Sequence, residues 1–184
     1  LTPVEISLNY RLEFGRYFAN ITNNANGTYS YYAFVNRTSG LLNTTETRTI
    51  ILDNAAPSTI TYQTPSETAG SFISRNNIVV NVTATDSIAL ANITIYLFNS
   101  TQNQINTSTS TTSPAYINFT GLSDGAHYFN ATVNDTYGNL NSSSGTRTVT
   151  IDTVPPNITY VSPTPENNTI NVGGNLTVNV TAAD

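Results

Sequence analysis

A repeat of about 98 residues constrains the fold of this chain more than any other feature of its sequence. The stretch "GTYSYYAFVNRTSGLLNTTETRTIILD", Gly27 to Asp53, aligns with "GAHYFNATVNDTYGNLNSSSGTRTVTID", Gly125 to Asp152. Residues 60–86 begin "ITY" and end "NVTATD", and residues 158–184 begin "ITY" and end "NVTAAD". A fixed period indicates an array of domains. The sequence therefore predicts the C-terminal part of a domain (1–53), a complete domain (54–152) and the N-terminal part of a further domain (153–184).

The two partial domains are complementary in sequence. Placing Leu1 after Asp184 gives "NVTAADLTPVEISLNY", which follows the internal "NVTATDSIALANITIY" nearly in register. We expect strands at Asn157–Val161 and Asn175–Ala182 in one part, and strands from Val4–Tyr10 through Thr47–Leu52 in the other. Neither part alone can bury its apolar face, and each leaves strand edges unpaired.

These complementary parts predict head-to-tail contacts between residues 153–184 of one copy and residues 1–53 of the next. Such a heterologous contact need not close into a ring, so its repetition builds a filament. Two mechanisms would produce similar sequences: a continuous polypeptide of many repeats, and separate subunits joined by strand donation. The nearly seamless register across Asp184 and Leu1 favours the continuous polypeptide.

Alternating apolar and polar residues within the complete domain predict an all-β fold. Ile78, Val80 and Val82 alternate with polar or outward positions, and later segments repeat the pattern. Seven short strands separated by turn signals are typical of an immunoglobulin-like β-sandwich. The expected strands are 58–63, 77–84, 91–99, 103–109, 114–120, 126–134 and 145–152. The residues expected to face inward are Ile78, Val80, Val82, Ala84, Ile93, Ile95, Leu97, Phe129, Ala131 and Val133.

The composition excludes several classes of function. Charged residues make up 9% of the chain, the formal net charge is −5, and all six basic residues are arginines. Binding to nucleic acid requires clustered Lys or Arg, which this chain lacks. The absence of cysteine excludes disulfides, zinc-thiolate sites and thiol nucleophiles. No apolar run approaches the roughly 20 residues that span a bilayer.

The stretch "LSDGAHYFNATVNDTYGN" from Leu122 resembles the Ig-like tandem repeats of bacterial and archaeal cell-surface proteins, which form filaments or giant surface proteins. The "DTVPPNI" entry from Asp152 to Ile158 strengthens the resemblance. It implies an Ig-like fold and a role as an adhesin stalk, a filament body or a spacer in a surface enzyme. The first repeat departs from the pattern, with Arg37 in place of Asp135 and Leu41 in place of Asn139.

The single histidine, His127, aligns with Tyr29 just inside an expected strand. We expect both rings to form hydrogen bonds with nearby backbone, as the tyrosine corner of sandwich folds does. With one His and no Cys, the chain offers no pair of nucleophile and base. The sequence therefore predicts a protein that is not an enzyme.

Asn-x-Ser/Thr triplets, the acceptors for N-glycosylation, occur about twice as often as the roughly 7 that random placement would give. Strand geometry offers one explanation, because Asn and Thr two residues apart share the solvent face while the middle residue packs inward. The scarcity of charge favours covalent N-glycans, which would keep a β-rod soluble and its edges apart. An archaeal cell fits this reading. The sixteen candidate acceptors are Asn20, Asn26, Asn36, Asn43, Asn81, Asn92, Asn99, Asn106, Asn118, Asn130, Asn134, Asn141, Asn157, Asn167, Asn175 and Asn179.

Acidic and amide residues at strand ends suggest a Ca²⁺ site. In an Ig-like sandwich the loops carrying Asp86, Asp135 and Asn139 share one pole, where the linker after Asp53 also enters. Ca²⁺ takes six to eight oxygen ligands, and such clusters can rigidify rods. The alternative is that Asp side chains at strand ends accept local turn hydrogen bonds.

Together these features predict a structural module of an extracellular filament or giant cell-surface protein, made of glycosylated Ig-like repeats. The alternative is an accessory, sugar-binding stalk region of a surface adhesin or secreted enzyme. Sugar binding would use exposed aromatic platforms, although most aromatic residues at alternating strand positions are core or cross-strand partners. The candidate platforms are Tyr10, Tyr17, Tyr31, Tyr32 and Tyr116.

Overall fold

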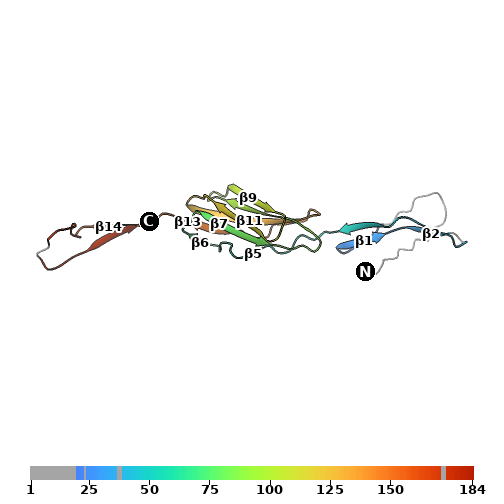
Figure 1. Cartoon of the computed structure of the whole chain (residues 1–184), viewed down its shortest axis with the longest axis horizontal. Helices are drawn as coiled ribbons and strands as arrows, with labels where there is room; N and C mark the ends of the chain where they lie inside the picture. The colour runs from blue at the N-terminus through green and yellow to red at the C-terminus, as the bar shows by residue number, and fades with distance from the viewer. Residues whose placement is uncertain (1–19, 23, 37–38, 171–172) are drawn as a thin grey trace. The chain divides into compact units, whose positions relative to one another are not determined.

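The computed structural model describes residues 20–22, 24–36, 39–170 and 173–184, and every regular element among them is a β-strand (Figure 1). The chain divides into two compact units, Leu1–Asp53 and Asn54–Asp184. The strand expected at residues 4–10 lies outside the described residues. Below, residues 1–53 are called the N-terminal partial repeat, residues 54–152 the complete repeat and residues 153–184 the C-terminal partial repeat.

The complete repeat is an immunoglobulin-like β-sandwich of two sheets (Figure 1). The smaller sheet has the order β10-β7-β5 and is antiparallel throughout. Its strands are β5 (Thr61–Tyr62), β7 (Asn77–Thr83) and β10 (Ala115–Thr120). The larger sheet has the order β6-β13-β11-β8-β9, with β12 beside β11. Its strands are β6 (Ser71–Ile73), β8 (Leu90–Phe98), β9 (Gln104–Ser110), β11 (Gly125–Asp135), β12 (Leu140–Asn141) and β13 (Arg147–Ile151).

The core lies between these sheets and is built from one face of each strand. Along β7, β8 and β11 buried and half-buried residues alternate, as the period of two in a half-buried strand requires. All ten residues that the sequence places inward are buried, which confirms the predicted faces. The remaining buried apolar residues are Ile60, Ala115, Phe119, Val149 and Ile151.

All seven predicted strands of the complete repeat are present, and two further strands were missed. The segment predicted at 58–63 forms a regular ladder with β7 only over β5. Gln63 and Glu67 still donate their N–H groups to the carbonyls of Asn81 and Val79, and the chain then joins the larger sheet as β6. There β6 runs parallel to β13, with Ser71 opposite Val149. Neither β6, with three residues, nor β12, with two, is long enough to show an alternating pattern.

The N-terminal partial repeat contains two ladders whose register matches the complete repeat. They are formed by β1 (Gly27–Tyr31) with β4 (Arg48–Leu52), and by β2 (Phe34–Asn36) with β3 (Leu42–Thr44). Tyr29 lies opposite Ile50, as His127 lies opposite Val149 between β11 and β13. The sequence repeat is therefore also a repeat of strand register.

The C-terminal partial repeat forms one antiparallel pair, β14 (Asn157–Val161) with β15 (Asn179–Ala183). Thr159 lies opposite Thr181, as Thr61 lies opposite Thr83 between β5 and β7. The strand predicted at 157–161 is confirmed, and the strand predicted at 175–182 begins later, at Asn179.

Candidate assembly faces of the partial repeats

The C-terminal partial repeat exposes an apolar face whose counterpart is core in the complete repeat. Val178 and Val180 are 58% and 46% exposed, whereas the equivalent Val80 and Val82 are fully buried. Ile158, Tyr160 and Leu176 are exposed in the same way. The alternation that made β7 a core strand is present, but the described residues supply nothing that covers it here.

Local hydrogen bonds are nevertheless the same in the two places. The Asn81 backbone N–H donates to Ser66 Oγ at 2.7 Å, and that hydroxyl donates to the Asn81 carbonyl at 2.7 Å. In the C-terminal partial repeat, the Asn179 N–H donates to Thr164 Oγ1 at 2.6 Å, and Thr164 Oγ1 donates to the Asn179 carbonyl at 2.7 Å. The backbone of the C-terminal partial repeat therefore has the same local conformation as in the complete repeat, although its apolar face is exposed.

The N-terminal partial repeat exposes the opposite half of such a core. Val35 and Ile50 are 65% and 47% exposed, whereas the equivalent Val133 and Val149 are fully buried. Tyr31, which aligns with the buried Phe129, is half exposed. This segment carries counterparts of β11 to β13, and the C-terminal partial repeat carries counterparts of β5 and β7. The two open faces thus correspond to opposite sheets of one sandwich.

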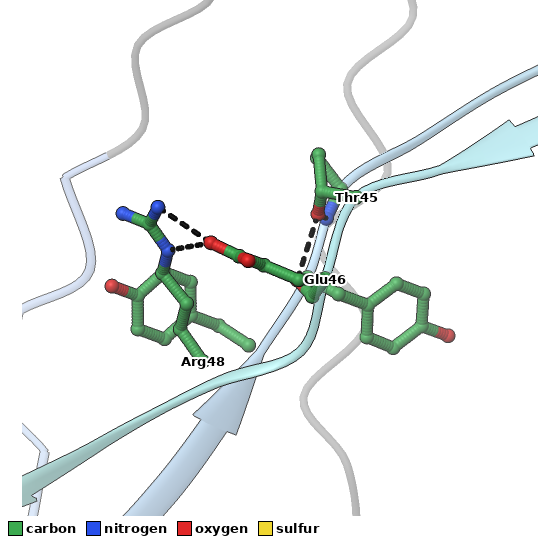
Figure 2. A pocket seen from close by; sticks show the side chains of 6 residues that line it. Thr45, Glu46 and Arg48 are labelled. Atoms are coloured by element: carbon green, nitrogen blue, oxygen red, sulfur yellow. Dashed lines mark hydrogen bonds and ion pairs between the residues drawn. The ribbon is translucent and has the colours of Figure 1, made fainter.

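A hollow of about 470 Å³ lies on the N-terminal partial repeat (Figure 2). Figure 2 shows the Arg48 guanidinium directed at the Glu46 carboxylate, and the closest N–O distance is 2.6 Å. Both side chains are about two-thirds exposed, so this ion pair adds little stability. The hydroxyl of Thr45 donates to the Glu46 carbonyl at 3.0 Å. The lining residues are Tyr31, Tyr32, Ala33, Thr45, Glu46 and Arg48.

Two of the five tyrosines considered as sugar platforms, Tyr31 and Tyr32, line this hollow. Tyr116 is exposed on β10, in the other compact unit. Tyr10 and Tyr17 lie outside the described residues. The structure therefore brings together Tyr31 and Tyr32, which are adjacent in the sequence.

Asp135 and Asp86 accept turn hydrogen bonds in the complete repeat. Asp135 Oδ1 accepts from the N–H groups of Tyr137 and Asn139, and Oδ2 accepts from Asn139 Nδ2 at 2.7 Å. Asp86 Oδ1 accepts from the N–H groups of Ile88 and Ala89. These bonds agree with the alternative interpretation, in which Asp side chains at strand ends accept local turn hydrogen bonds.

The pKa of Asp135 lies below its ordinary value. Burial is the largest single influence and raises the pKa, because it disfavours the charged carboxylate. The hydrogen bonds from the Asn139 side chain and from the backbone of Asn139, Tyr137 and Gly138 together outweigh it. Asp135 is therefore held as a carboxylate by the turn that it closes.

The Ca²⁺ hypothesis remains a prediction. Ligand oxygens of Asp86 and Asp135 come within 4.8 Å of each other, and Asn139 lies beside Asp135. Asp53, the last residue of the other compact unit, accepts a 3.0 Å bond from Asn26 Nδ2. Two carboxylates and one amide provide fewer than the six to eight oxygens that Ca²⁺ takes. Arg37, which aligns with Asp135, lies outside the described residues.

His127 has a structural environment, as predicted. It is buried, and its Nδ1 lies 3.2 Å from the Gly125 carbonyl, a contact that the Nδ1-protonated tautomer satisfies. The aligned Tyr29 donates its hydroxyl to the Ala25 carbonyl at 2.7 Å. Both polar rings therefore bond to backbone two to four residues earlier.

The candidate glycosylation sites fall into two groups by exposure. Some half-buried members use their amide nitrogen for structure: Asn81 Nδ2 donates to the Thr64 carbonyl, and Asn141 Nδ2 donates to the carbonyls of Pro57 and Ser58. The half-buried group is Asn26, Asn81, Asn92, Asn99, Asn130, Asn134 and Asn141. The exposed group is Asn20, Asn43, Asn106, Asn118, Asn157, Asn167, Asn175 and Asn179. The backbone of Asn36 lies in β2, and its side chain is outside the described set.

Sequence reasoning missed the polar cluster around Tyr62. The Tyr62 ring meets Phe129 edge to face, with centroids 5.5 Å apart, and Arg147 Cζ lies 4.1 Å above it. Burial raises the pKa of Tyr62, and the Ser144 hydrogen bond and the Arg147 charge oppose that rise. A signal was available, because the repeat aligns Tyr62 with Tyr160 and Arg147 with Arg48.

No protein-family model matches this chain, and no curated protein matches its sequence. Among solved structures it is similar to fibronectin(III)-like modules of Clostridium thermocellum CbhA, at 16% identity and a TM-score of 0.39, over 71% of this chain and 64% of that one. It is also similar to dimeric latent PorU from Porphyromonas gingivalis, at 13% identity and a TM-score of 0.40, over 69% of this chain and 12% of that one. The assignment as an Ig-like sandwich rests on the strand order of this chain itself.

Within the described part of the chain, no helix has the length and apolarity needed to cross a membrane.

Proposed function

We propose that this chain is a structural module of an extracellular filament or giant cell-surface protein, and that it continues head-to-tail through its partial repeats. The observation that carries the proposal is a pair of open faces, each with the strand register of a sandwich half. Val178 and Val180 on one face and Val35 and Ile50 on the other are exposed, whereas their equivalents are fully buried.

Magnitudes favour association. Complete burial of one Val, Leu or Ile side chain contributes about 1.5–3 kcal/mol. Bringing two partners together costs on the order of 4–15 kcal/mol in lost freedom of motion. Seven partly exposed apolar side chains have buried counterparts in the complete repeat, so their full burial contributes a free energy of the same order as that cost. They are Tyr31, Val35, Ile50, Ile158, Leu176, Val178 and Val180.

The contact is heterologous, because one face supplies counterparts of β5 and β7 and the other supplies counterparts of β11 to β13. A contact of this kind leaves a free face at each end of every dimer, so further copies add in a line. The same contact serves separate subunits and a continuous polypeptide.

The remaining features support a non-catalytic surface role. Weak charge and sixteen N-glycosylation acceptors suit a sugar-coated module of an exporting cell such as an archaeon. The only His in the chain is buried against backbone, which suits structure better than catalysis. Ca²⁺ bound by Asp53, Asp86, Asp135 and Asn139 would add rigidity to such a module.

Sedimentation velocity over a range of concentrations tests the proposal. The 184-residue chain is expected to form a ladder of linear oligomers that lengthens with concentration. Val180→Glu, which places a charge on the open face, is expected to leave a monomer. Thr181→Glu is the matched control. Thr181 is next to Val180 on β15 and points to the other side of the strand, so this substitution should leave the series of oligomers unchanged. A wild-type chain that stays monomeric at every concentration would overturn the proposal.

The hollow lined by Tyr31 and Tyr32 supports a second candidate, a sugar-binding stalk. Exposed aromatic rings form platforms on which sugar rings can pack. Binding of the unglycosylated chain to a glycan array tests this function. Saturable binding that Tyr32→Ala abolishes would favour the stalk, and the absence of binding at millimolar sugar would exclude it.

A further inference from the structure

Tyr62 fills a well-defined socket in the complete repeat. Its ring lies edge to face on Phe129 and beneath Arg147, at 5.5 Å between centroids and 4.1 Å from Cζ respectively. Its hydroxyl donates to the Gly145 carbonyl at 3.1 Å and also lies 3.3 Å from Ser144 Oγ. An aromatic ring, a cation and a carbonyl therefore define the socket.

The floor of this socket is held by two hydrogen bonds that recur in the N-terminal partial repeat. In the complete repeat, the Ala131 N–H donates to Ser144 Oγ at 2.8 Å, and that hydroxyl donates to the Gly145 carbonyl at 3.1 Å. In the partial repeat, the Ala33 N–H donates to Thr45 Oγ1 at 2.9 Å. Thr45 Oγ1 in turn donates to the Glu46 carbonyl at 3.0 Å.

The walls recur as well. Tyr31 aligns with Phe129, and Arg48 aligns with Arg147. Tyr31, Ala33, Thr45, Glu46 and Arg48 all line the hollow of about 470 Å³ in Figure 2. The hollow is therefore lined by counterparts of the residues that hold Tyr62, and Tyr32, which aligns with Asn130, is a further lining residue.

The residue that aligns with Tyr62 is Tyr160, on β14 of the C-terminal partial repeat. It lies opposite Val180 in the ladder, as Tyr62 lies opposite Val82. Its side chain is 74% exposed. The repeat thus provides a formed socket at one end of the sequence and the matching ring at the other.

We propose that Tyr160 of a second copy inserts into the hollow lined by Tyr31, Ala33, Thr45, Glu46 and Arg48, and anchors the head-to-tail contact. This inference rests on the proposed function and names the anchor and its socket. The Tyr160 hydroxyl donates to the Glu46 carbonyl, its ring edge meets Tyr31, and the Arg48 guanidinium stacks over its face. Burial makes that stacking stronger than the same contact in water.

The hollow differs from the Tyr62 socket in one residue that affects its charge. Glu46 replaces Gly145 and holds Arg48 through an ion pair. Figure 2 shows the guanidinium paired with the Glu46 carboxylate, and both residues line the hollow. Only the Glu46 carbonyl is needed as an acceptor, so its side chain remains free to neutralise Arg48 while the ring enters.

The test compares dissociation constants for self-association of Tyr160 variants, measured by sedimentation. Truncating a buried aromatic anchor weakens an interface at least about 30-fold, and that loss is expected for Tyr160→Ala. Tyr160→Phe keeps the ring and loses one hydrogen bond, so a weakening of about 3- to 10-fold is expected. Tyr116→Ala is the matched control, because Tyr116 is an exposed strand tyrosine outside both open faces, and it should change nothing.

A second measurement uses only the wild-type chain, so it does not depend on whether the variants fold. In hydroxyl-radical footprinting of wild-type oligomers, Tyr160 should be protected relative to the monomer, whereas Tyr116 should not. Oligomers that form with full wild-type affinity in Tyr160→Ala, or in which Tyr160 stays reactive, would overturn the anchor and leave the proposed function standing. Absence of oligomers in the wild type would overturn both.

Discussion

The complete repeat and the two partial repeats share strand register and local hydrogen bonds but differ in burial. Ser66 bonds to the N–H and carbonyl of Asn81 on β7, and Thr164 bonds in the same way to Asn179 on β15. Yet Val82 is fully buried, whereas its equivalent Val180 is 46% exposed. The difference separates two kinds of information in the chain. Pairing of neighbouring strands is specified within a segment, but burial requires the opposite sheet.

The comparison also explains why the Tyr160 position is informative. Tyr62 in the β5–β7 ladder and Tyr160 in the β14–β15 ladder occupy equivalent places. Among the described residues Tyr62 fills a socket within its own repeat, whereas Tyr160 is exposed. The other socket is formed on the N-terminal partial repeat, with its floor hydrogen bonds in place. A formed site and an exposed matching ring favour assembly from preformed parts, which lowers the entropic cost of binding.

The largest expected effect contrasts Phe129→Ala with Tyr31→Ala in dilute, monomeric chain. Removing the fully buried Phe129 ring should lower the free energy of unfolding of the complete repeat by about 3–5 kcal/mol. Tyr31→Ala removes a half-exposed ring and should cost less than about 0.5 kcal/mol. Hydrogen exchange of β11 and β1 measures the two regions separately. Similar losses at both positions would mean that the N-terminal partial repeat is already covered.

The second prediction concerns Ca²⁺. If the acidic loop ends bind it, Ca²⁺ at 100 times its dissociation constant would stabilise the folded chain by about 2.7 kcal/mol, and excess chelator would lower the melting temperature accordingly. Asp86→Asn should remove the difference between Ca²⁺ and chelator. Melting curves that coincide with and without chelator would leave the carboxylates with their turn hydrogen bonds alone.

The third prediction follows from the lowered pKa of Asp135. Because the folded-state pKa lies below the unfolded one, the stabilisation is present above about pH 4 and is lost as pH falls further through the folded-state pKa. Asp135→Asn should therefore be less stable than wild type at neutral pH, and the gap should narrow in acid. Denaturant titrations at several pH values measure this gap. A gap that widens below pH 4 would contradict the assignment.

The smallest effect on stability is expected from glycans, which should distinguish exposed from structurally engaged asparagines. Asn106 and Asn118 are exposed on β9 and β10, so we expect them to carry sugars in native material. Asn81 and Asn141 donate their amide nitrogens to backbone carbonyls and should remain unmodified. Glycopeptide mass spectrometry measures occupancy at each site. Full occupancy of Asn141 with Asn118 bare would reverse the expected pattern.

Much of the fold was predictable, because alternation and the repeat act within short segments. Ile78, Val80 and Val82 were assigned to the core from alternation alone, and all three are fully buried. The strand β6 was not predictable, because its three residues pair in parallel with β13, far along the chain. The Tyr62 cluster was missed for the same reason. Its partners Phe129, Ser144 and Arg147 come from distant segments, and only the aligned Tyr160 and Arg48 gave a hint.

A cysteine pair provides the most direct test of head-to-tail completion. In the complete repeat Asn118 lies opposite Val79 without exchanging hydrogen bonds with it. The Val79 N–H donates to Glu67 Oε1, and the Val79 carbonyl accepts from the Glu67 N–H. Such non-hydrogen-bonded pairs bring Cα atoms to about 4.5 Å, which suits a disulfide. The aligned residues in the partial repeats are Asn20 and Thr177.

Because the chain has no cysteine, one chain carrying Asn20→Cys can be mixed with another carrying Thr177→Cys and oxidised without competing thiols. The proposed register predicts a disulfide-linked heterodimer on a non-reducing gel. A mixture of Asn20→Cys with Thr181→Cys, four residues out of register, should give none. Equal cross-linking in both mixtures, or none in the first despite reactive thiols, would contradict completion of one sandwich by two copies.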